Sequence, residues 1–272
     1  MVAQVLNLSK LGAVSRANMA SNALVTPETS RFLREILEKA LTNPVGVAPR
    51  WAAEAWALLA NILVNDYLQK WNYAGRVELN NAEDAMENAL ALNSELALAY
   101  HAKGLIRRAR GDHDGAFAAF ETALSKDQNF ARAHAQKGNE LILRGRPKDA
   151  LPHVADAIKL SPNDPGIATF YWIKGRAHFF AAEYDEAIPP LEQSVEQQPN
   201  LWYTWAYMVA ATAVKDKGRA GAILAQFKSL FGDLTLKDIK EYEESNPDDN
   251  QVVVDARDAL HRLLLDAGMR EQ

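Results

Sequence analysis

One stretch of the sequence repeats itself at a fixed offset of 34 positions. Between residues 97 and 164, four small residues recur at this offset: Gly104 as Gly138, Gly111 as Gly145, Ala116 as Ala150 and Ala123 as Ala157. A fixed period of this size is typical of repeat arrays. Small residues at these positions allow two helices to approach closely within a unit and the next unit to stack on the pair. The pattern therefore predicts a stack of helix pairs.

Each repeat has the pattern of two helices joined by a short turn. In the first repeat, Gly111 follows the first helix and can end it in the left-handed conformation, because glycine has no Cβ. The polar residues Asp112, His113 and Asp114 then supply a turn and helix-capping side chains. The second helix has an apolar face at helical spacing, formed by Ala116, Phe117, Phe120, Ala123 and Leu124. An antiparallel helix pair is the expected unit.

The register of these residues is specific. Counted from Ala97, the fourth, eighth, twentieth, twenty-fourth and twenty-seventh places hold Tyr100, Gly104, Ala116, Phe120 and Ala123. In this register the chain resembles the tetratricopeptide repeat family. Similar units begin at Ala53, Ala131 and Ala168, and a degenerate fifth unit begins near Trp202. The resemblance implies an all-α fold, a right-handed α-solenoid of about four to five repeats with capping helices at its ends.

The segments outside the repeats differ from them in pattern. Residues 1–25 contain no acidic residue and interrupt their apolar residues with polar ones, so we expect a loosely ordered N-terminal segment. A targeting peptide or the remnant of an upstream domain is the alternative. The solenoid is expected over residues 26–232, beginning with a helix at Thr26-Pro27. Its apolar stripe would comprise Phe32, Leu33, Ile36, Leu37, Ala40 and Leu41.

Residues 233–272 are predicted to form C-terminal capping helices. The last of these has an apolar face made of Val252, Val253, Ala256, Leu260, Leu263 and Leu264. A terminal helix of a solenoid must cover an apolar face that would otherwise meet water. We therefore expect this helix to close the C-terminal end of the array.

The first unit departs from the repeat by an insertion of about ten residues between its helices. The insertion lies around residues 67–73 and includes Tyr67, Trp71 and Tyr73. One interpretation is an extended first helix whose aromatic residues pack on neighbouring helices. The alternative is a lip that takes part in binding.

Charge and composition exclude several classes of protein. The net charge of −5 argues against a general nucleic-acid binder, because phosphate contacts need a basic face. The absence of cysteine excludes disulfides, thiol catalysis and thiolate metal sites, and is compatible with a cytoplasmic location. No apolar run approaches the roughly 18 residues that suggest a membrane span. We expect a soluble, cytoplasmic protein.

The sequence offers no pattern of catalytic residues. The six histidines lack the spacing of a metal-binding pair on one helix, and neither a phosphate-binding glycine loop nor a nucleophile elbow is present. We therefore expect no catalysis, no cofactor and no bound metal. An enzyme is retained only as a remote alternative, because a fold alone assigns no activity.

The resemblance implies a binding groove lined by the first helices of the repeats. In the family, the second, fifth, ninth and twelfth places tend to point into it, and here these places hold Asn61, His101, Arg108, Arg132, Asn139, Trp172, Arg176 and Tyr203. Arginine and asparagine can hydrogen-bond an extended peptide, and the aromatic residues offer flat anchors. The predicted function is a scaffold that binds a protein segment, acidic and with an aromatic or apolar anchor. The arginines could instead pair with acidic residues of adjacent helices.

A narrower resemblance concerns residues 51–269. The closing Leu265-Asp-Ala-Gly268-Met and the phrases KG, RARG and RP within the repeats look like the C-terminal repeat region of bacterial cyclase-like or winged-helix signalling proteins. No cyclase or DNA-binding segment occurs in the sequence. A regulatory fragment of such a signalling protein is the alternative to a free-standing adaptor. The family's chaperone-tail clamp is not expected, because its lysine is absent from the fifth place. Association of like chains is compatible with the sequence.

Overall fold

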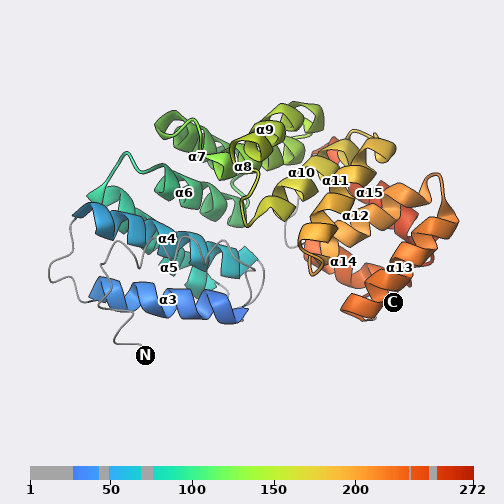
Figure 1. The fold of residues 1–272 in the computed structure, drawn as a ribbon, viewed down its shortest axis with the longest axis horizontal. Coiled ribbons are helices and arrows are strands. Elements are labelled where there is room, and N and C mark those ends of the chain that lie inside the picture. Colours follow the sequence, from blue (N-terminus) through green and yellow to red (C-terminus); the bar gives the residue numbers. More distant parts are fainter. Residues whose placement is uncertain (1–26, 43–48, 69–75, 233, 245–249) are drawn as a thin grey trace. The chain divides into compact units, whose positions relative to one another are not determined.

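The computed structural model describes residues 27–42, 49–68, 76–232, 234–244 and 250–272. These residues form thirteen helices, labelled α3 to α15 in Figure 1, and no strand. The chain divides into two compact units, residues 1–133 and 134–272, and the division falls within the helix α8 (Ala131–Leu143). The predicted all-α class is confirmed. The expected loose segment, residues 1–25, lies outside the described residues.

Unit 1 is built from helices that pack in chain order. The helix α3 packs against α4, α4 against α5, and α6 against both α7 and α4 (Figure 1). A buried hydrogen bond from the Ser30 hydroxyl to the Asp66 carboxylate joins α3 to α4. The bounds are α3 (Pro27–Thr42), α4 (Pro49–Leu68), α5 (Arg76–Leu92), α6 (Ala97–Ala109) and α7 (His113–Lys126).

Unit 2 continues the same pattern of helix pairs. The helices α10 and α11 pack together, as do α12 and α13, and α11 also contacts α12. Consecutive pairs therefore stack in chain order, which is the architecture of an α-solenoid. The bounds are α9 (Pro147–Leu160), α10 (Ile167–Phe180), α11 (Tyr184–Gln197), α12 (Trp202–Ala213), α13 (Lys217–Phe231), α14 (Leu236–Glu244) and α15 (Gln251–Asp266).

The repeated small residues lie where the two helices of a pair meet. Ala116, Ala123, Ala150 and Ala157 are all fully buried, as the repeat predicts. A Cβ added to Gly138 would meet Val154 Cγ2 at 2.8 Å and the carbonyl oxygen of Ala150 at 3.3 Å. Any larger residue at the eighth place would therefore push the paired helices apart.

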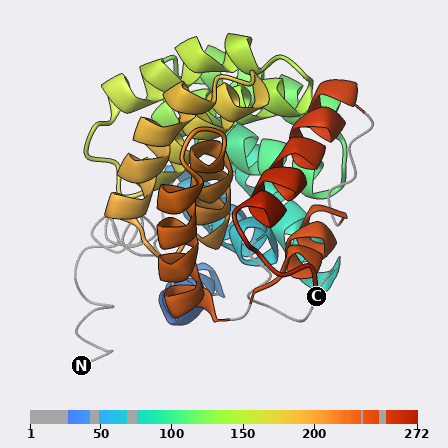
Figure 2. The ribbon, with the colours of Figure 1, turned by 90° about the vertical axis from the view of Figure 1, so that its right-hand side faces the viewer.

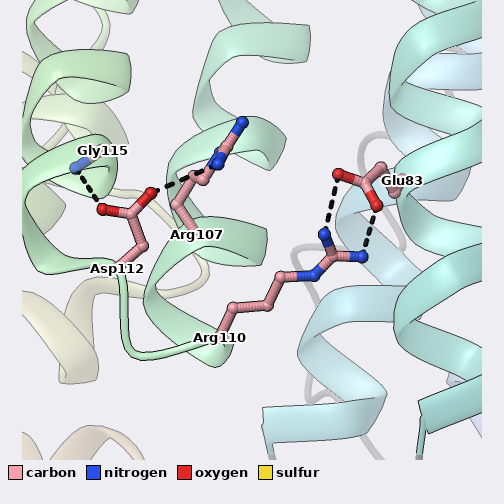
Figure 3. Close-up of polar contacts among 5 residues, drawn as sticks. All are labelled: Glu83, Arg107, Arg110, Asp112 and Gly115. Carbon is pink, nitrogen blue, oxygen red and sulfur yellow. Dashed lines mark hydrogen bonds and ion pairs between the residues drawn. The ribbon is translucent and has the colours of Figure 1, made fainter.

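The turns inside the pairs α6–α7 and α8–α9 have the expected chemistry. Gly111 and Gly145 have φ angles of 76° and 72°, in the left-handed region that glycine enters without strain. In Figure 3 the Asp112 carboxylate caps α7 by accepting a hydrogen bond of 2.8 Å from the backbone N–H of Gly115, and it also pairs with Arg107 at 3.3 Å.

A second ion pair beside this turn joins α6 to α5. Arg110 follows the last residue of α6, and both terminal nitrogens of its guanidinium reach the Glu83 carboxylate on α5 (Figure 3). The pair is partly exposed, so its contribution to stability is small, at most about 1 kcal/mol.

The first helices of unit 1 depart from the sequence prediction at one residue. Leu33 and Leu37 of α3 are buried, but Phe32 is 58% exposed and does not belong to the buried stripe. Phe32 precedes Leu33 by one position, which turns it about 100° away from the face that meets α4.

The helix α4 is longer than α6 and ends at Leu68, with Tyr67 packed against the core, as the extended-helix interpretation expects. Trp71 and Tyr73 lie outside the described residues.

The C-terminal helix covers α12. In Figure 2 the red helix is α15, and it packs against α12. Val253, Leu260 and Leu264 are buried, whereas Val252 is 38% exposed and was wrongly assigned to the apolar face. Val252 lies in the first turn of the helix, next to the buried Val253 and on a different face.

Candidate binding surface

All eight predicted binding residues lie on the first helices of the pairs. Asn61 is on α4, His101 and Arg108 on α6, Arg132 and Asn139 on α8, Trp172 and Arg176 on α10, and Tyr203 on α12. Five are buried, and Arg132, Trp172 and Tyr203 are half-buried. We call Asn61, His101, Arg108 and Arg132 the unit 1 cluster, and Asn139, Trp172, Arg176 and Tyr203 the unit 2 cluster.

The unit 1 cluster is centred on His101, which is 5% exposed. The Nδ1 of His101 lies 2.6 Å from Asn61 Oδ1. The Asn61 amide donates to the carbonyl oxygens of Ala57 and Leu98, at 2.8 and 3.1 Å. These two bonds fix the orientation of the amide, which directs Oδ1 toward His101. An amide oxygen only accepts, so His101 Nδ1 is the donor. This fixes the proton on Nδ1 and leaves Nε2 as an acceptor.

The charge of His101 is suppressed in the folded protein. Burial, together with the guanidinium groups of Arg132 and Arg108, lowers the pKa of His101 from 6.5 to about 3. All three causes disfavour the imidazolium ion. His101 is therefore neutral at ordinary pH and presents a hydrogen-bond acceptor beside two cations.

Aromatic rings enclose this histidine. The ring centroids of Phe120 and Phe130 lie 5.8 and 5.3 Å from that of His101. The guanidinium carbon of Arg108 lies 5.3 Å from the centroid of the same Phe120 ring. Sequence reasoning treated Phe120 as core and did not assign a role to Phe130. Phe130 lies between the repeats, at the residue before α8, so the helical periodicity gave no signal for it.

The unit 2 cluster is centred on Arg176, which is 8% exposed. Its Nη1 donates to Asn139 Oδ1 at 2.9 Å, which joins α10 to α8. Its guanidinium carbon lies 5.4 Å from the ring centroid of Trp172 and 4.8 Å from that of Phe180. Phe180 was missed by the sequence reasoning. The signal was present, because Trp172, Arg176 and Phe180 are spaced by four residues and share one face of a helix.

Trp172 connects this cluster to α12, which is the first helix of the next pair. Its ring centroid lies 4.7 Å from that of Tyr203 on α12, and the two rings are tilted by 58°. The Nε1 of Trp172 and the Nε of Arg176 are buried and have no hydrogen-bond partner within the described part of the chain. Unit 2 thus brings together Asn139, Arg176, Trp172 and Tyr203, in agreement with the sequence register.

Neither a metal site nor a membrane span occurs in the described residues. They contain no group of three or more His, Cys, Asp or Glu side chains that could hold a metal ion. No helix in the same ranges has the length and apolar character needed to cross a membrane. What the described structure does contain is two clusters of hydrogen-bonding and aromatic side chains on stacked helices.

The architecture and the register define the class of fold as that of tetratricopeptide repeat proteins. Proteins of known structure with this fold match the chain at probability 1.00. Compared by sequence, the chain matches no protein-family profile and no curated protein.

Three solved structures illustrate the likeness. TTC0263, a thermophilic tetratricopeptide repeat protein of Thermus thermophilus, has a TM-score of 0.54 and 16% identity, covering 75% of this chain and 98% of that one. PilW, a type IV pilus biogenesis factor, has a TM-score of 0.57 and 17% identity, covering 77% and 90%. The APC/C hetero-tetramer Cut9–Hcn1 gives 0.64 and 18%, covering 96% of this chain and 48% of that one. At these identities the likeness shows the fold alone.

Proposed function

We propose that this chain is a protein-interaction scaffold and that its two clusters bind a segment of a partner protein. The observation that supports the proposal is the chemistry of the first helices where they meet. Burying polar groups between helices costs free energy that apolar residues would not cost. Arg108, Arg176, Asn61 and Asn139 are nevertheless buried there. A recognition role explains why such costly residues occupy these positions.

The partner segment is proposed to be acidic and to include an aromatic or apolar anchor. The clusters present cations and hydrogen-bonding groups although the chain as a whole has a net charge of −5. The half-buried rings of Trp172 and Tyr203 offer a flat surface to an anchor. Such charged contacts weaken as salt is added.

The test begins with capture of a partner by the full chain and its identification by mass spectrometry. Binding of the identified segment is then measured by calorimetry at low salt for Arg132→Ala, Arg176→Ala and the double variant. We expect the double variant to lose about 1–3 kcal/mol of binding free energy while keeping its helicity. Arg219→Ala is the matched control, because Arg219 pairs with Glu192 on the exposed surface.

Unchanged affinity in the double variant would refute binding through these clusters. The insertion around residues 67–73 would then be the next surface to test. No catalytic role is proposed, because the clusters lack a nucleophile paired with a base. The proposed location is the cytoplasm, in accord with a sequence that has no cysteine.

The narrower resemblance to cyclase-like or winged-helix signalling proteins leads to a second proposal. If residues 51–269 are a regulatory repeat region, a cyclase or DNA-binding domain should be encoded upstream or in a neighbouring gene. Sequencing of the surrounding locus separates this regulatory fragment from a free-standing adaptor. A locus that encodes no such domain would refute the regulatory fragment and favour a free-standing adaptor.

A further inference from the structure

Arg176 is a buried cation that pairs with no anion in the described part of the chain. Its hydrogen bond within the described residues goes to the neutral amide of Asn139, and no carboxylate there pairs with it. The rings of Trp172 and Phe180 compensate part of the charge through cation–π contacts. A guanidinium has five N–H donors and no acceptor, so most of its hydrogen-bonding capacity is unused here.

The unused donors lie on one edge of the guanidinium. Because Nη1 is engaged by Asn139, the edge formed by Nε and Nη2 remains. Nε is buried and has no hydrogen-bond partner in the described structure. Two parallel N–H groups on one edge match the two oxygens of a carboxylate, which is the geometry of bidentate pairing.

Trp172 provides another donor on the same helix face. It precedes Arg176 by four residues, so the two side chains are neighbours on α10. Its indole Nε1 is also buried and also lacks a partner among the described residues. An indole N–H can only donate. The face therefore combines a cation with a second donor, a combination that an anion satisfies.

We propose that Arg176 and Trp172 form a carboxylate site that binds the side chain of a glutamate in a partner segment. The proposal rests on the proposed scaffold function and deepens it. Asn139 holds the guanidinium in position from α8, and it acts as a positioning residue. The Trp172 ring lies beside the guanidinium and contacts the Tyr203 ring.

Two properties favour a glutamate side chain as the ligand, namely its single negative charge and the length of its side chain. One guanidinium balances one negative charge, whereas a phosphate group brings up to two and would leave one uncompensated in a buried site. The guanidinium is largely covered, so its ligand must reach it on a narrow stem. A glutamate carboxylate has two methylenes that can lie along the Trp172 ring. A chain-terminal carboxylate is attached directly to the main chain, which would have to enter the site with it.

The experiment follows two indole signals in the full chain labelled with ¹⁵N. The signal of Trp172 reports the site, and that of Trp205 is an internal control, because its Nε1 already donates to the Pro199 carbonyl oxygen at 2.8 Å. Both are assigned by triple-resonance spectra. Sodium acetate is added at constant ionic strength against sodium chloride. We expect the Trp172 indole signal to shift and saturate with acetate while the Trp205 signal stays in place.

The variants separate carboxylate binding from a general salt effect. Arg176→Gln should abolish the saturable shift of Trp172, and the exposed control Arg219→Gln should retain it. A Trp172 signal that acetate does not move in the wild-type chain would overturn the proposal without any variant. So would an equal shift in the wild-type chain and in a folded Arg176→Gln chain. A larger response to inorganic phosphate than to acetate would overturn the choice of a carboxylate.

Three short peptides then identify the source of the carboxylate. Two have blocked ends and differ only in one glutamate or glutamine, and the third has the glutamine and a free C-terminus. We expect the glutamate peptide to half-saturate the Trp172 shift at about tenfold lower concentration than the other two. An equal response to the free C-terminus would overturn the side-chain assignment.

The outcome is independent of the capture experiment. If acetate leaves Trp172 unmoved but a captured partner still depends on Arg132, this site is refuted and the scaffold function stands. If acetate binds and the full chain captures no partner, the carboxylate site stands and the scaffold function is refuted.

Discussion

At the scale of single residues, the buried amides determine what their neighbours can do. Asn61 is held by two backbone carbonyls, and this orientation dictates the tautomer of His101. Asn139 similarly engages one end of the Arg176 guanidinium and leaves the other edge unused. In both units an asparagine at the ninth place of one repeat thus orients a side chain of the next repeat.

The suppressed charge of His101 predicts a pH-dependent stability. The unfolded chain binds a proton at His101 near pH 6.5, whereas the folded chain binds it only near pH 3. Between these values the unfolded state holds more protons, so stability falls as the pH falls. From about pH 7.5 to about pH 5, His101 should remove about 2 kcal/mol of the free energy of unfolding. Urea unfolding of the wild-type chain and of His101→Gln measures this.

The variant isolates the contribution of one group, since carboxylates contribute equally to both chains. His101→Gln should therefore lose about 2 kcal/mol less than the wild-type chain over the same pH interval. If both chains lose the same amount, His101 is not held neutral by burial, Arg132 and Arg108.

For Arg176 and His101, the sequence predicted the position of each residue on its helix but not how deeply its side chain is buried. The repeat register gives the face on which Arg176 and His101 lie, because that depends only on helical spacing. Whether a side chain is covered depends on residues from other helices. Phe130 beside His101 illustrates this, since it belongs to a connection between repeats and follows no period.

At the scale of helices, the repeated small residues set how closely a pair can pack. Gly138 of α8 faces Ala150 and Val154 of α9 with no room for a larger side chain. The same place in the next unit, Gly175, would bring a Cβ to 2.5 Å from Leu191 Cγ. The helix contact is therefore made by backbone and small side chains, and it tolerates little added volume.

Ala150→Leu should destabilise the protein by overfilling this contact. Ala150 is fully buried, so three additional carbons must displace α8 or α9, at a cost of about 1–3 kcal/mol. Ala155→Leu in the same helix is the matched control, because Ala155 is exposed and its replacement should change stability by less than about 0.5 kcal/mol. Equal denaturation midpoints for the two variants would show that the assigned register is wrong.

Helix positions were predictable where the period persists and less so at its margins. The pairs from α6 to α11 follow the repeat, and the alanines predicted at their helix contacts are all buried: Ala116, Ala123, Ala150 and Ala157. Phe32 and Val252 were assigned to buried stripes and are exposed, because each lies beside the stripe of its helix and hydrophobicity alone does not show which side is covered.

At the scale of the whole chain, the C-terminal end of unit 2 is held by backbone hydrogen bonds. Unit 2 ends with residues that have no counterpart in the repeats. The backbone N–H groups of Leu236 and Lys237, at the start of α14, donate to the carbonyl oxygens of Arg270 and Glu271 at 3.0 and 3.1 Å. These bonds join the chain terminus to α14. The repeat pattern predicted C-terminal capping helices. It could not predict these hydrogen bonds, because the residues that form them lie outside the repeats.

The last helix should be required for the stability of unit 2. Residues 204–213 of α12 are buried, and α15, whose Val253, Leu260 and Leu264 are buried too, packs against α12. A helix that is apolar on all sides needs neighbours on all sides. Deletion of residues 252–272 should therefore expose α12 and give a lower Tm or aggregation, measured by thermal unfolding and light scattering. The sequence predicts no such loss on deletion of residues 1–22.

Point variants within α15 distinguish lost cover from a general effect of truncation. Leu260→Ala removes a buried side chain and should cost about 2–5 kcal/mol. Val252→Ala removes one that is 38% exposed in the same helix and should cost much less. Equal tolerance of the two deletions, together with a Leu260→Ala chain as stable as Val252→Ala, would refute the proposed capping role of residues 233–272. A loss confined to the C-terminal deletion and to Leu260→Ala would assign that role to the face of α15 that meets α12.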